Sequence, residues 1–131
     1  DNLTSDEDLQ NVLTLLRSFG QADIVTEPIL DIVGAVSGSS PAFVFMFIEA
    51  LADGAVAEGM PRKQAYDFAA QAVLGSAKMV LETKKHPGEL KDMVCSPAGT
   101  TIEGVNTLEK EGMRSAVMDA VRACIQKTRK L

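Results

Sequence analysis

The fold of this chain is decided by the stretch Ala42-Phe43-Val44-Phe45-Met46-Phe47-Ile48-Glu49-Ala50-Leu51-Ala52-Asp53-Gly54-Ala55-Val56-Ala57-Glu58. It predicts a helix that is apolar on nearly every side, because only Glu49, Asp53 and Glu58 carry charge. A helix that is hydrophobic all round is buried all round. In so small a domain only a second subunit can enclose it on every face, so the stretch predicts an intimate homodimer. The stretch does not determine whether such dimers assemble into a higher oligomer. The alternative is the central helix of a monomeric bundle.

From Pro28 onward the chain is expected to be entirely helical. Apolar residues recur at the spacing of one helix face, and Cys124 lies on such a face, which predicts a core position for it. The glycines, hydroxyls and proline of residues 34–41 predict a break or kink before the apolar stretch. After that stretch, further helices are expected near residues 65–80, 89–93, 100–112 and 113–128.

Residues 1–27 have a different pattern. Thr4-Ser5-Asp6-Glu7 resembles a capping box, and an amphipathic helix follows until Gly20 provides a left-handed stop. Residues 22–26 have the composition of a β-strand. Because a lone strand needs neighbours for its backbone groups, residues 1–27 are interpreted as the terminal helix and edge strand of a truncated sheet domain. Residues 28–131 then form a separate helical domain.

Composition excludes several classes of protein. The 131 residues are 46% hydrophobic and 24% charged, which is typical of a soluble globular domain. The net charge of -5 argues against a nucleic-acid partner. The acidic N-terminus is unlike a secretory signal, and no uninterrupted apolar run approaches the roughly 18 to 20 residues of a membrane helix. We therefore expect a cytoplasmic protein with no membrane or nucleic-acid partner.

The titratable and thiol side chains do not suggest a catalytic or metal centre. Cys95 and Cys124 lack a CxxC spacing, and the chain has one histidine, which favours reduced thiols over a disulfide framework or a metal site. His86 precedes a proline and is interpreted as a helix-start residue rather than a proton donor. Asp53 and Glu58 are expected to pair with Arg or Lys rather than to catalyse. No catalytic residue is assigned.

The polar loop over residues 94–101 is the main candidate site. Its small residues leave backbone N–H groups uncovered where the next helix begins, which is the outline of an anion site. Gly99 permits close approach of the backbone, and the hydroxyls of Ser96, Thr100 and Thr101 add neutral donors for a carboxylate. From the pattern alone, an ordinary helix N-cap remains the alternative.

The chain resembles the pyrroline-5-carboxylate reductases, most specifically in the segment Asp92-Met93-Val94-Cys95-Ser96-Pro97-Ala98-Gly99-Thr100-Thr101-Ile102-Glu103-Gly104-Val105. Four other segments resemble the C-terminal domain of that family in the same order, and the similarity covers essentially the whole chain. They are Ala35-Val36-Ser37-Gly38-Ser39-Ser40-Pro41-Ala42-Phe43, Glu49-Ala50-Leu51-Ala52-Asp53-Gly54-Ala55-Val56, Gly59-Met60-Pro61-Arg62 and His86-Pro87-Gly88-Glu89-Leu90-Lys91-Asp92.

The resemblance implies an all-α domain of the 6-phosphogluconate dehydrogenase C-terminal type, preceded by the last helix and strand of a Rossmann domain. It implies an oxidoreductase of proline biosynthesis, which reduces 1-pyrroline-5-carboxylate to L-proline with NADPH or NADH. The cofactor would be bound mainly by a missing N-terminal domain, because this chain has no GxGxxG segment, and the chain alone would be inactive. A non-catalytic helical dimerisation module is the alternative.

The resemblance also implies two groups of site residues. The substrate-binding group would be Val94, Ser96, Gly99, Thr100 and Thr101. The group near the active site would be Ser37, Gly38 and Ser39. The chain departs from the family at Gly34, which is often a threonine, and at Ser40 and Ala98, where many members have glycine. The change at Ala98 is expected to be mild, because alanine tolerates every backbone region except those with positive φ.

Overall fold

The structure is a computed structural model that describes residues 4–130, and over this range the chain is all-α, as expected. Residues 1–3 and 131, the outer ends of the two expected domains, lie outside the described residues. The helical elements are α1 (Asp6–Arg17), η1 (a 3-10 turn, Glu27–Ile29), α2 (Leu30–Val33), η2 (a π-helical turn, Gly34–Ser39), α3 (Ser40–Ala57), α4 (Arg62–Thr83), α5 (Pro87–Val94), α6 (Thr100–Lys110) and α7 (Met113–Thr128).

The elements from η1 to α3 join into one continuous helix, Glu27–Ala57, of 31 residues. Of the break or kink predicted over residues 34–41, the break does not occur, and the α-helical pattern is instead interrupted by π-helical geometry in η2. Pro41 has no N–H to donate, and the wider turn accommodates this loss without ending the helix. The hydroxyl of Ser37 donates to the carbonyl of Val33 at 2.7 Å and so satisfies an acceptor beside the wider turn.

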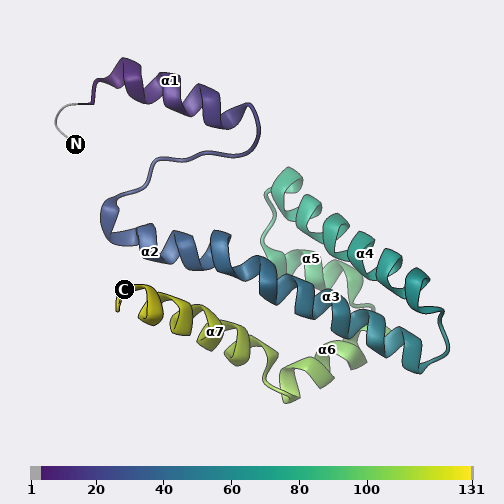
Figure 1. The fold of residues 1–131 in the computed structure, drawn as a ribbon. Helices are drawn as coiled ribbons and strands as arrows, with labels where there is room; N and C mark the ends of the chain where they lie inside the picture. Colours follow the sequence, from purple (N-terminus) through teal and green to yellow (C-terminus); the bar gives the residue numbers. More distant parts are fainter. Residues whose placement is uncertain (1–3, 131) are drawn as a thin grey trace.

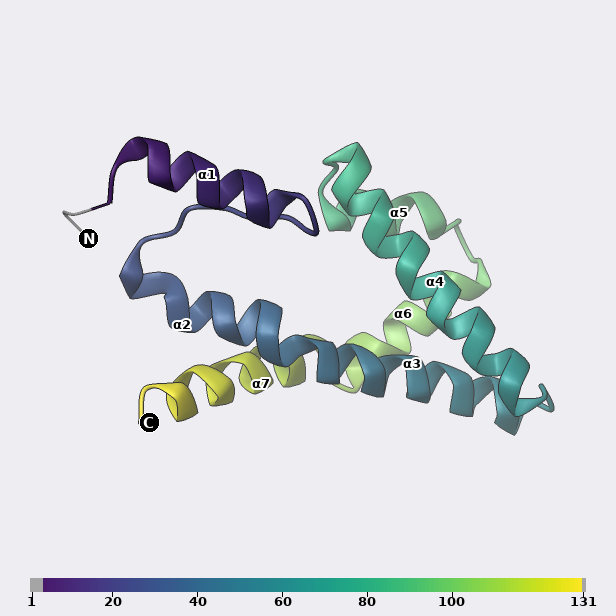
Figure 2. The ribbon, with the colours of Figure 1, turned by 45° about the horizontal axis from the view of Figure 1, so that its top comes forward.

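Two helix pairs form the body of the molecule. Figure 1 shows α4 crossing α3, and α7 running back along α2 and η2, while α5 and α6 connect the two pairs. An ion pair between Arg129 Nε and Asp31 Oδ2 (3.4 Å) ties the end of α7 to α2. Cys124, predicted to lie in the core, is only half-buried, because no residue of α7 is buried within this copy. In Figure 2, α1 stands apart from this body at the end of an extended segment.

The tightest packing is between α3 and α4, where Ala52, Ala65 and Ala69 are buried. Alanine side chains are small enough for the two helices to approach closely at this crossing. The chain reverses between the helices at Gly59, whose φ of +99° is a left-handed conformation that favours glycine. Two backbone hydrogen bonds of the Schellman type end α3 there.

One copy of the chain leaves most of its large apolar side chains in solvent. Among residues 4–130 only Leu13 and four alanines are buried, and Phe45 and Met46 on α3 are each 68% exposed. The chain exposes 10459 Å², whereas a compact monomer of 14.0 kDa exposes about 6,700 Å². The long helix also has the length and composition to cross a membrane, which the sequence did not show because residues 34–41 divide its apolar runs. Its apolar faces therefore need cover from outside this copy.

Three local predictions for the N-terminal segment are wrong. The capping box lies one residue later than predicted, because the Asp8 N–H bonds to Ser5 Oγ (3.1 Å) and the Ser5 N–H bonds to Asp8 Oδ2 (3.2 Å). The cap at the C-terminal end of α1 is Ser18 in right-handed geometry, so Gly20 is not a left-handed stop. Residues 22–26 form no strand, because no neighbour within the described part of the chain supplies the hydrogen bonds that a strand needs.

We expect Ala69→Leu to lower the free energy of unfolding by about 1–3 kcal/mol, because the larger side chain must force α3 and α4 apart. Urea titration followed by circular dichroism measures the change. Ala70→Leu is the control, since Ala70 is exposed on the same helix, and this substitution should change the free energy of unfolding by less than about 0.5 kcal/mol. Equal stability of the two variants would contradict the close crossing of α3 and α4.

Candidate functional site

The candidate loop lies between α5 and α6, and α5 holds its first residue in place. His86 begins α5, because its Nδ1 accepts the Gly88 N–H at 3.0 Å. The interpretation of His86 as a helix-start residue is therefore confirmed. At the other end of α5, the Cys95 N–H bonds to the carbonyls of Lys91 and Asp92, both at 3.1 Å.

Residues 96–99 close a tight turn, in which the Gly99 N–H donates to the Ser96 carbonyl at 3.0 Å. Pro97 takes the second position of this turn, for which its fixed φ is suited. Ala98 takes the third position with a φ of +56°, which glycine adopts freely and alanine adopts only at a cost. The prediction that alanine is a mild change here is therefore wrong.

Residue 99 must be glycine because a side chain would not fit there, and not because of its backbone φ. It is the N-cap of α6 and has an extended backbone, with φ -82° and ψ 168°. A Cβ at this position would collide with Ser96 Oγ and would lie 3.1 Å from the Ser96 carbonyl oxygen. A larger residue would displace the Ser96 hydroxyl, so the glycine lets this hydroxyl lie against the start of α6.

The N-terminus of α6 is open. No side chain caps it, and Ser96, Thr100, Thr101 and the neighbouring Val94 are exposed. No hydrogen bond within residues 4–130 engages the three hydroxyls. The first turn of a helix carries unsatisfied N–H groups and the positive end of the helix dipole. This arrangement has the donors and the field to bind an anion.

The second expected group, Ser37, Gly38 and Ser39, lies in η2. Single π-helical turns within α-helices occur frequently at functional sites. η2 packs against α7, and Ala35 is buried there. In both Figure 1 and Figure 2, η2 lies apart from the loop between α5 and α6. One copy of the chain therefore does not bring the two groups together.

The departures from the family at Gly34 and Ser40 cause no backbone strain. Both residues have right-handed helical conformations, with φ of -57° and -64°, so glycine is not needed at residue 40. A Cβ added to Gly34 would meet nothing within 4 Å, so a threonine there would find open space in this copy.

Asp53 and Glu58 at the end of α3 differ in their partners. Asp53 forms an ion pair with Arg62 at the start of α4, as predicted. The Arg62 guanidinium lies 5.6 Å from the centre of the Tyr66 ring, and its hydrogen bond to Asp53 raises the pKa of Arg62. Both partners are exposed, so the pair contributes little to stability. Glu58 makes no ion pair within residues 4–130 of this copy, so the pairing expected for it stays a prediction.

The side chains at the loop are hydroxyls rather than metal ligands. Within the described part of the chain, no three His, Cys, Asp or Glu residues lie close enough together to hold a metal ion. Cys95 at the end of α5 and Cys124 in α7 are both free thiols. The groups that the loop offers to a ligand are therefore backbone N–H groups and alcohols.

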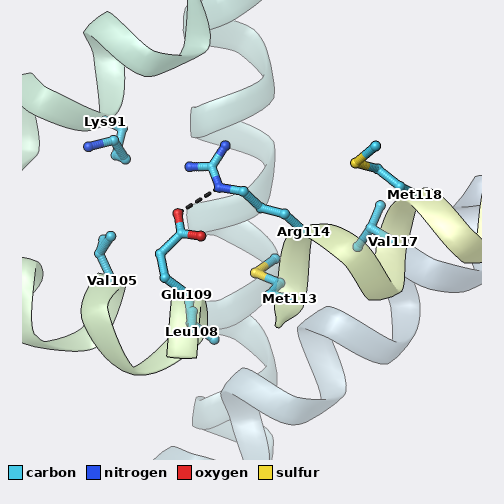
Figure 3. Close-up of a pocket in the computed structure, with 8 residues that line it drawn as sticks. All are labelled: Lys91, Val105, Leu108, Glu109, Met113, Arg114, Val117 and Met118. Carbon is cyan, nitrogen blue, oxygen red and sulfur yellow. Dashed lines mark hydrogen bonds and ion pairs between the residues drawn. The ribbon is translucent and has the colours of Figure 1, made fainter. Parts of the chain in front are cut away.

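A groove of about 500 Å³ lies between α5, α6 and α7, as Figure 3 shows. Three charged residues line it, Lys91, Glu109 and Arg114, and Arg114 Nε donates to Glu109 Oε1 at 2.6 Å. The sequence alone does not reveal this groove, because an apolar stripe predicts a buried face without showing which neighbour covers it. The apolar wall consists of Val105, Leu108, Met113, Val117 and Met118.

A family model described as "Pyrroline-5-carboxylate reductase dimerisation" matches residues 27–131. The chain belongs to this family. It is 62% identical over 129 residues to the pyrroline-5-carboxylate reductase of Escherichia coli (strain K12), a match that covers 98% of this chain and 48% of that protein. It is 55% identical over 125 residues to the reductase of Methanosarcina acetivorans, covering 95% of this chain and 46% of that protein. The chain thus spans about half the length of the curated relatives that it matches.

Solved structures of pyrroline-5-carboxylate reductases share the fold of this chain. The enzyme of Streptococcus pyogenes superposes with a TM-score of 0.92 at 37% identity, covering 100% of this chain and 51% of that chain. The enzyme of Plasmodium falciparum, with NADP bound, superposes with a TM-score of 0.90 at 33% identity, covering 99% of this chain and 52% of that chain. The family resemblance stated from the sequence is confirmed.

We expect Ala98→Gly to raise the free energy of unfolding by about 1 kcal/mol, because it relieves the left-handed strain in the turn. Chemical denaturation measures the change. Ala70→Gly is the control in an ordinary helical conformation, and it should lower the free energy of unfolding by about 0.5–1 kcal/mol. A loss of stability in both variants would show that Ala98 is not strained.

Proposed function

We propose that this chain is the C-terminal half of a pyrroline-5-carboxylate reductase, which reduces 1-pyrroline-5-carboxylate to L-proline in the last step of proline biosynthesis. The observation that carries the proposal is the open N-terminus of α6, where alcohols and backbone N–H groups are exposed together. The curated relatives of that name, of which the chain spans about half, support it. Residues 1–27 would belong to the preceding nucleotide-binding domain, and residues 28–131 would form the dimer and hold the substrate.

The substrate is a ring acid, and its carboxylate is the group that this loop suits. The first turn of α6 would donate its free N–H groups, and the hydroxyls of Ser96, Thr100 and Thr101 would add further donors. Gly99 keeps the Ser96 hydroxyl close to this turn. Because every donor is neutral, the loop would hold the carboxylate without placing a cation beside the protonated ring nitrogen. Val94, exposed beside the loop, would contact the ring.

NADPH or NADH, when bound, supplies the hydride that reduces the C=N bond of the substrate. A dinucleotide site requires a strand, a glycine-rich turn and a helix, and residues 4–130 contain no strand. The cofactor would therefore be held mainly outside these residues, and the chain alone would be inactive. The part played by this chain is to fix the ring acid in one orientation, which lowers the entropic barrier to hydride transfer.

The reductase would be a homodimer whose active site is completed by two copies. One copy holds η2 and the loop at residues 96–101 apart, and the family to which the chain belongs is described by its dimerisation. Residues 37–39 of one copy would then face the substrate on the loop of the other. A cytoplasmic location is part of the same proposal and agrees with the two free thiols.

In the full-length reductase we expect Thr101→Ala to raise KM for 1-pyrroline-5-carboxylate by about tenfold or more, because one hydrogen bond to a charged group is lost. KM for the cofactor should not change. Thr107→Ala is the control on the same helix, since the Thr107 hydroxyl already donates to the Glu103 carbonyl at 3.1 Å. Steady-state kinetics measures both KM values in the two variants. An unchanged KM for the substrate in Thr101→Ala would count against the carboxylate site.

The same site is tested in the chain itself by titration with L-proline, followed by amide chemical shifts. The expected result is saturable shifts centred on residues 96–101, weakened in Thr101→Ala and unaltered in Thr107→Ala. Pyrrolidine, which lacks the carboxylate, should not cause these shifts. If proline shifts no amide of the loop, the non-catalytic helical dimerisation module becomes the better explanation of the chain.

A further inference from the structure

We propose that His86 is a positioning residue for the loop between α5 and α6, and that it holds this loop in place only while its imidazole is neutral. The imidazole caps the N-terminus of α5, and α5 leads directly into the loop. Protonation of the ring removes the cap, so mild acid would loosen the loop. The consequence for substrate binding rests on the proposed function, whereas the consequence for α5 and for the loop backbone does not.

The cap of α5 is a hydrogen bond that only a neutral imidazole can accept. His86 Nδ1 accepts the Gly88 N–H, and the two nitrogens lie 3.0 Å apart. A neutral imidazole has one nitrogen that accepts and one that donates, whereas both nitrogens of an imidazolium donate. After protonation, two donors would face each other at this distance. The positive end of the α5 dipole would also oppose the added charge, so acid breaks this cap.

The residues after His86 fit the imidazole to this role. Pro87 stands at the first helical position and has no N–H that needs a partner. The Leu90 N–H is already satisfied by the His86 carbonyl at 3.2 Å. Gly88 leaves room for the ring, because a Cβ there would lie only 3.0 Å from His86 Nδ1 and 3.3 Å from Cε1. The ring therefore lies close against the first donor of α5 that needs a cap.

α5 depends on its cap because little else in one copy holds it. The helix has eight residues, none of which is buried, and isolated helices shorter than about 12–15 residues are marginal in water. Within residues 4–130, no hydrogen bond or ion pair joins α5 to another helix. Loss of a side-chain N-cap shifts a helix equilibrium by about fivefold. A shift of this size would unwind a large share of so short a helix.

The C-terminal end of α5 fixes the point from which the loop starts. The Cys95 N–H bonds to the carbonyls of Lys91 and Asp92, both at 3.1 Å. The next backbone hydrogen bond, from the Gly99 N–H to the Ser96 carbonyl at 3.0 Å, closes the turn before α6. If α5 unwinds, Cys95 loses both acceptors and the turn loses its fixed start. The cap at one end of α5 therefore affects the donors that follow its other end.

The charged groups near His86 are paired with one another and leave no free counterion for an imidazolium. Lys84 and Lys85 precede the ring in sequence, and Glu89 on α5 is paired with Lys85 at 2.5 Å. On α4, the residues that face α5 across a groove are not titratable: Ser76, Met79 and Val80. The charged residues in the last turns of α4 pair with each other at 3.6 Å: Lys78 and Glu82. α6 and α7 face α5 with a pair at 2.6 Å: Glu109 and Arg114.

The test follows the chain, in the assembly that it forms, at pH 7.5 and pH 5.5. Histidine ordinarily changes charge within this range, whereas carboxylates, thiols and lysines ordinarily do so outside it. His86 is the only histidine in the chain, so its ring signals report the protonation directly. Hydrogen exchange of the α5 amides measures the cap, amide chemical shifts of residues 95–99 measure the loop, and titration with L-proline measures binding.

For the unmodified chain, acid should lower the exchange protection of the α5 amides by about two- to fivefold, after correction for the intrinsic exchange rate. The amide shifts of residues 95–99 should follow the same midpoint as the His86 ring signals. The dissociation constant of L-proline should rise by up to the same factor. The proline carboxylate stays ionised throughout, so the ligand does not cause the change. Amides in the middle of α4 should keep their protection.

Three variants separate the protonation of the cap from a merely structural role. His86→Ala should behave at both pH values as the unmodified chain does at pH 5.5. His86→Asn should restore protection and proline binding at both pH values, because an amide oxygen caps without titrating. His86→Ser provides a second capping side chain if the asparagine variant does not fold. Lys85→Gln is the control, since it changes the charge beside the ring but leaves the cap, and acid should still weaken α5.

Three results would overturn the role of His86. They are equal protection of α5 at both pH values in the unmodified chain, the same loss of protection in His86→Asn, and a loss of protection in α5 that leaves the amide shifts of residues 95–99 unmoved. Absence of proline binding would remove the proposed substrate site, but α5 and the loop shifts would still decide whether His86 positions the loop. The two proposals therefore fail separately.

Discussion

The whole structure depends on burial of the apolar side chains that α3 exposes in a single copy. This helix carries large apolar side chains on nearly all its sides, and the chain covers only the side that faces α4, where Ala52, Ala65 and Ala69 make the crossing. The hydrophobic effect grows with the apolar area removed from water. The exposed apolar faces of α3, α6 and α7 therefore raise the free energy of a single folded copy in water. The fold is consequently an open arrangement of helix pairs rather than a closed bundle.

This openness also determines where the candidate site can form. The donors proposed for a carboxylate lie at the start of α6, and the π-helical turn η2 lies on the long helix, apart from them in the same copy. A pocket that needs both must be built from two copies, because neither element reaches the other within one chain. In the proposed reductase, assembly and substrate binding would be coupled, and any change that separates the copies would also open the site.

Much of this could be predicted from sequence, and the failures share one physical origin. The apolar pattern of α3 and the small and hydroxyl residues around Gly99 are local properties, so the helix and the loop with its exposed alcohols were predictable. The continuity of the helix through residues 34–41 was not, because it depends on a wider turn that accommodates the missing N–H of Pro41. Residues 22–26 have strand composition, but a strand depends on neighbours. The φ of Ala98 likewise depends on how the surrounding turn closes.

The requirement for a second copy is tested most directly by the thermal unfolding midpoint as a function of protein concentration. If folding and association are one event, mass action favours the dimer at higher concentration, and the midpoint should rise steadily over a range of about a hundredfold. A fully helical chain whose midpoint is the same at every concentration would contradict this, because it would show that one copy is stable with α3 uncovered.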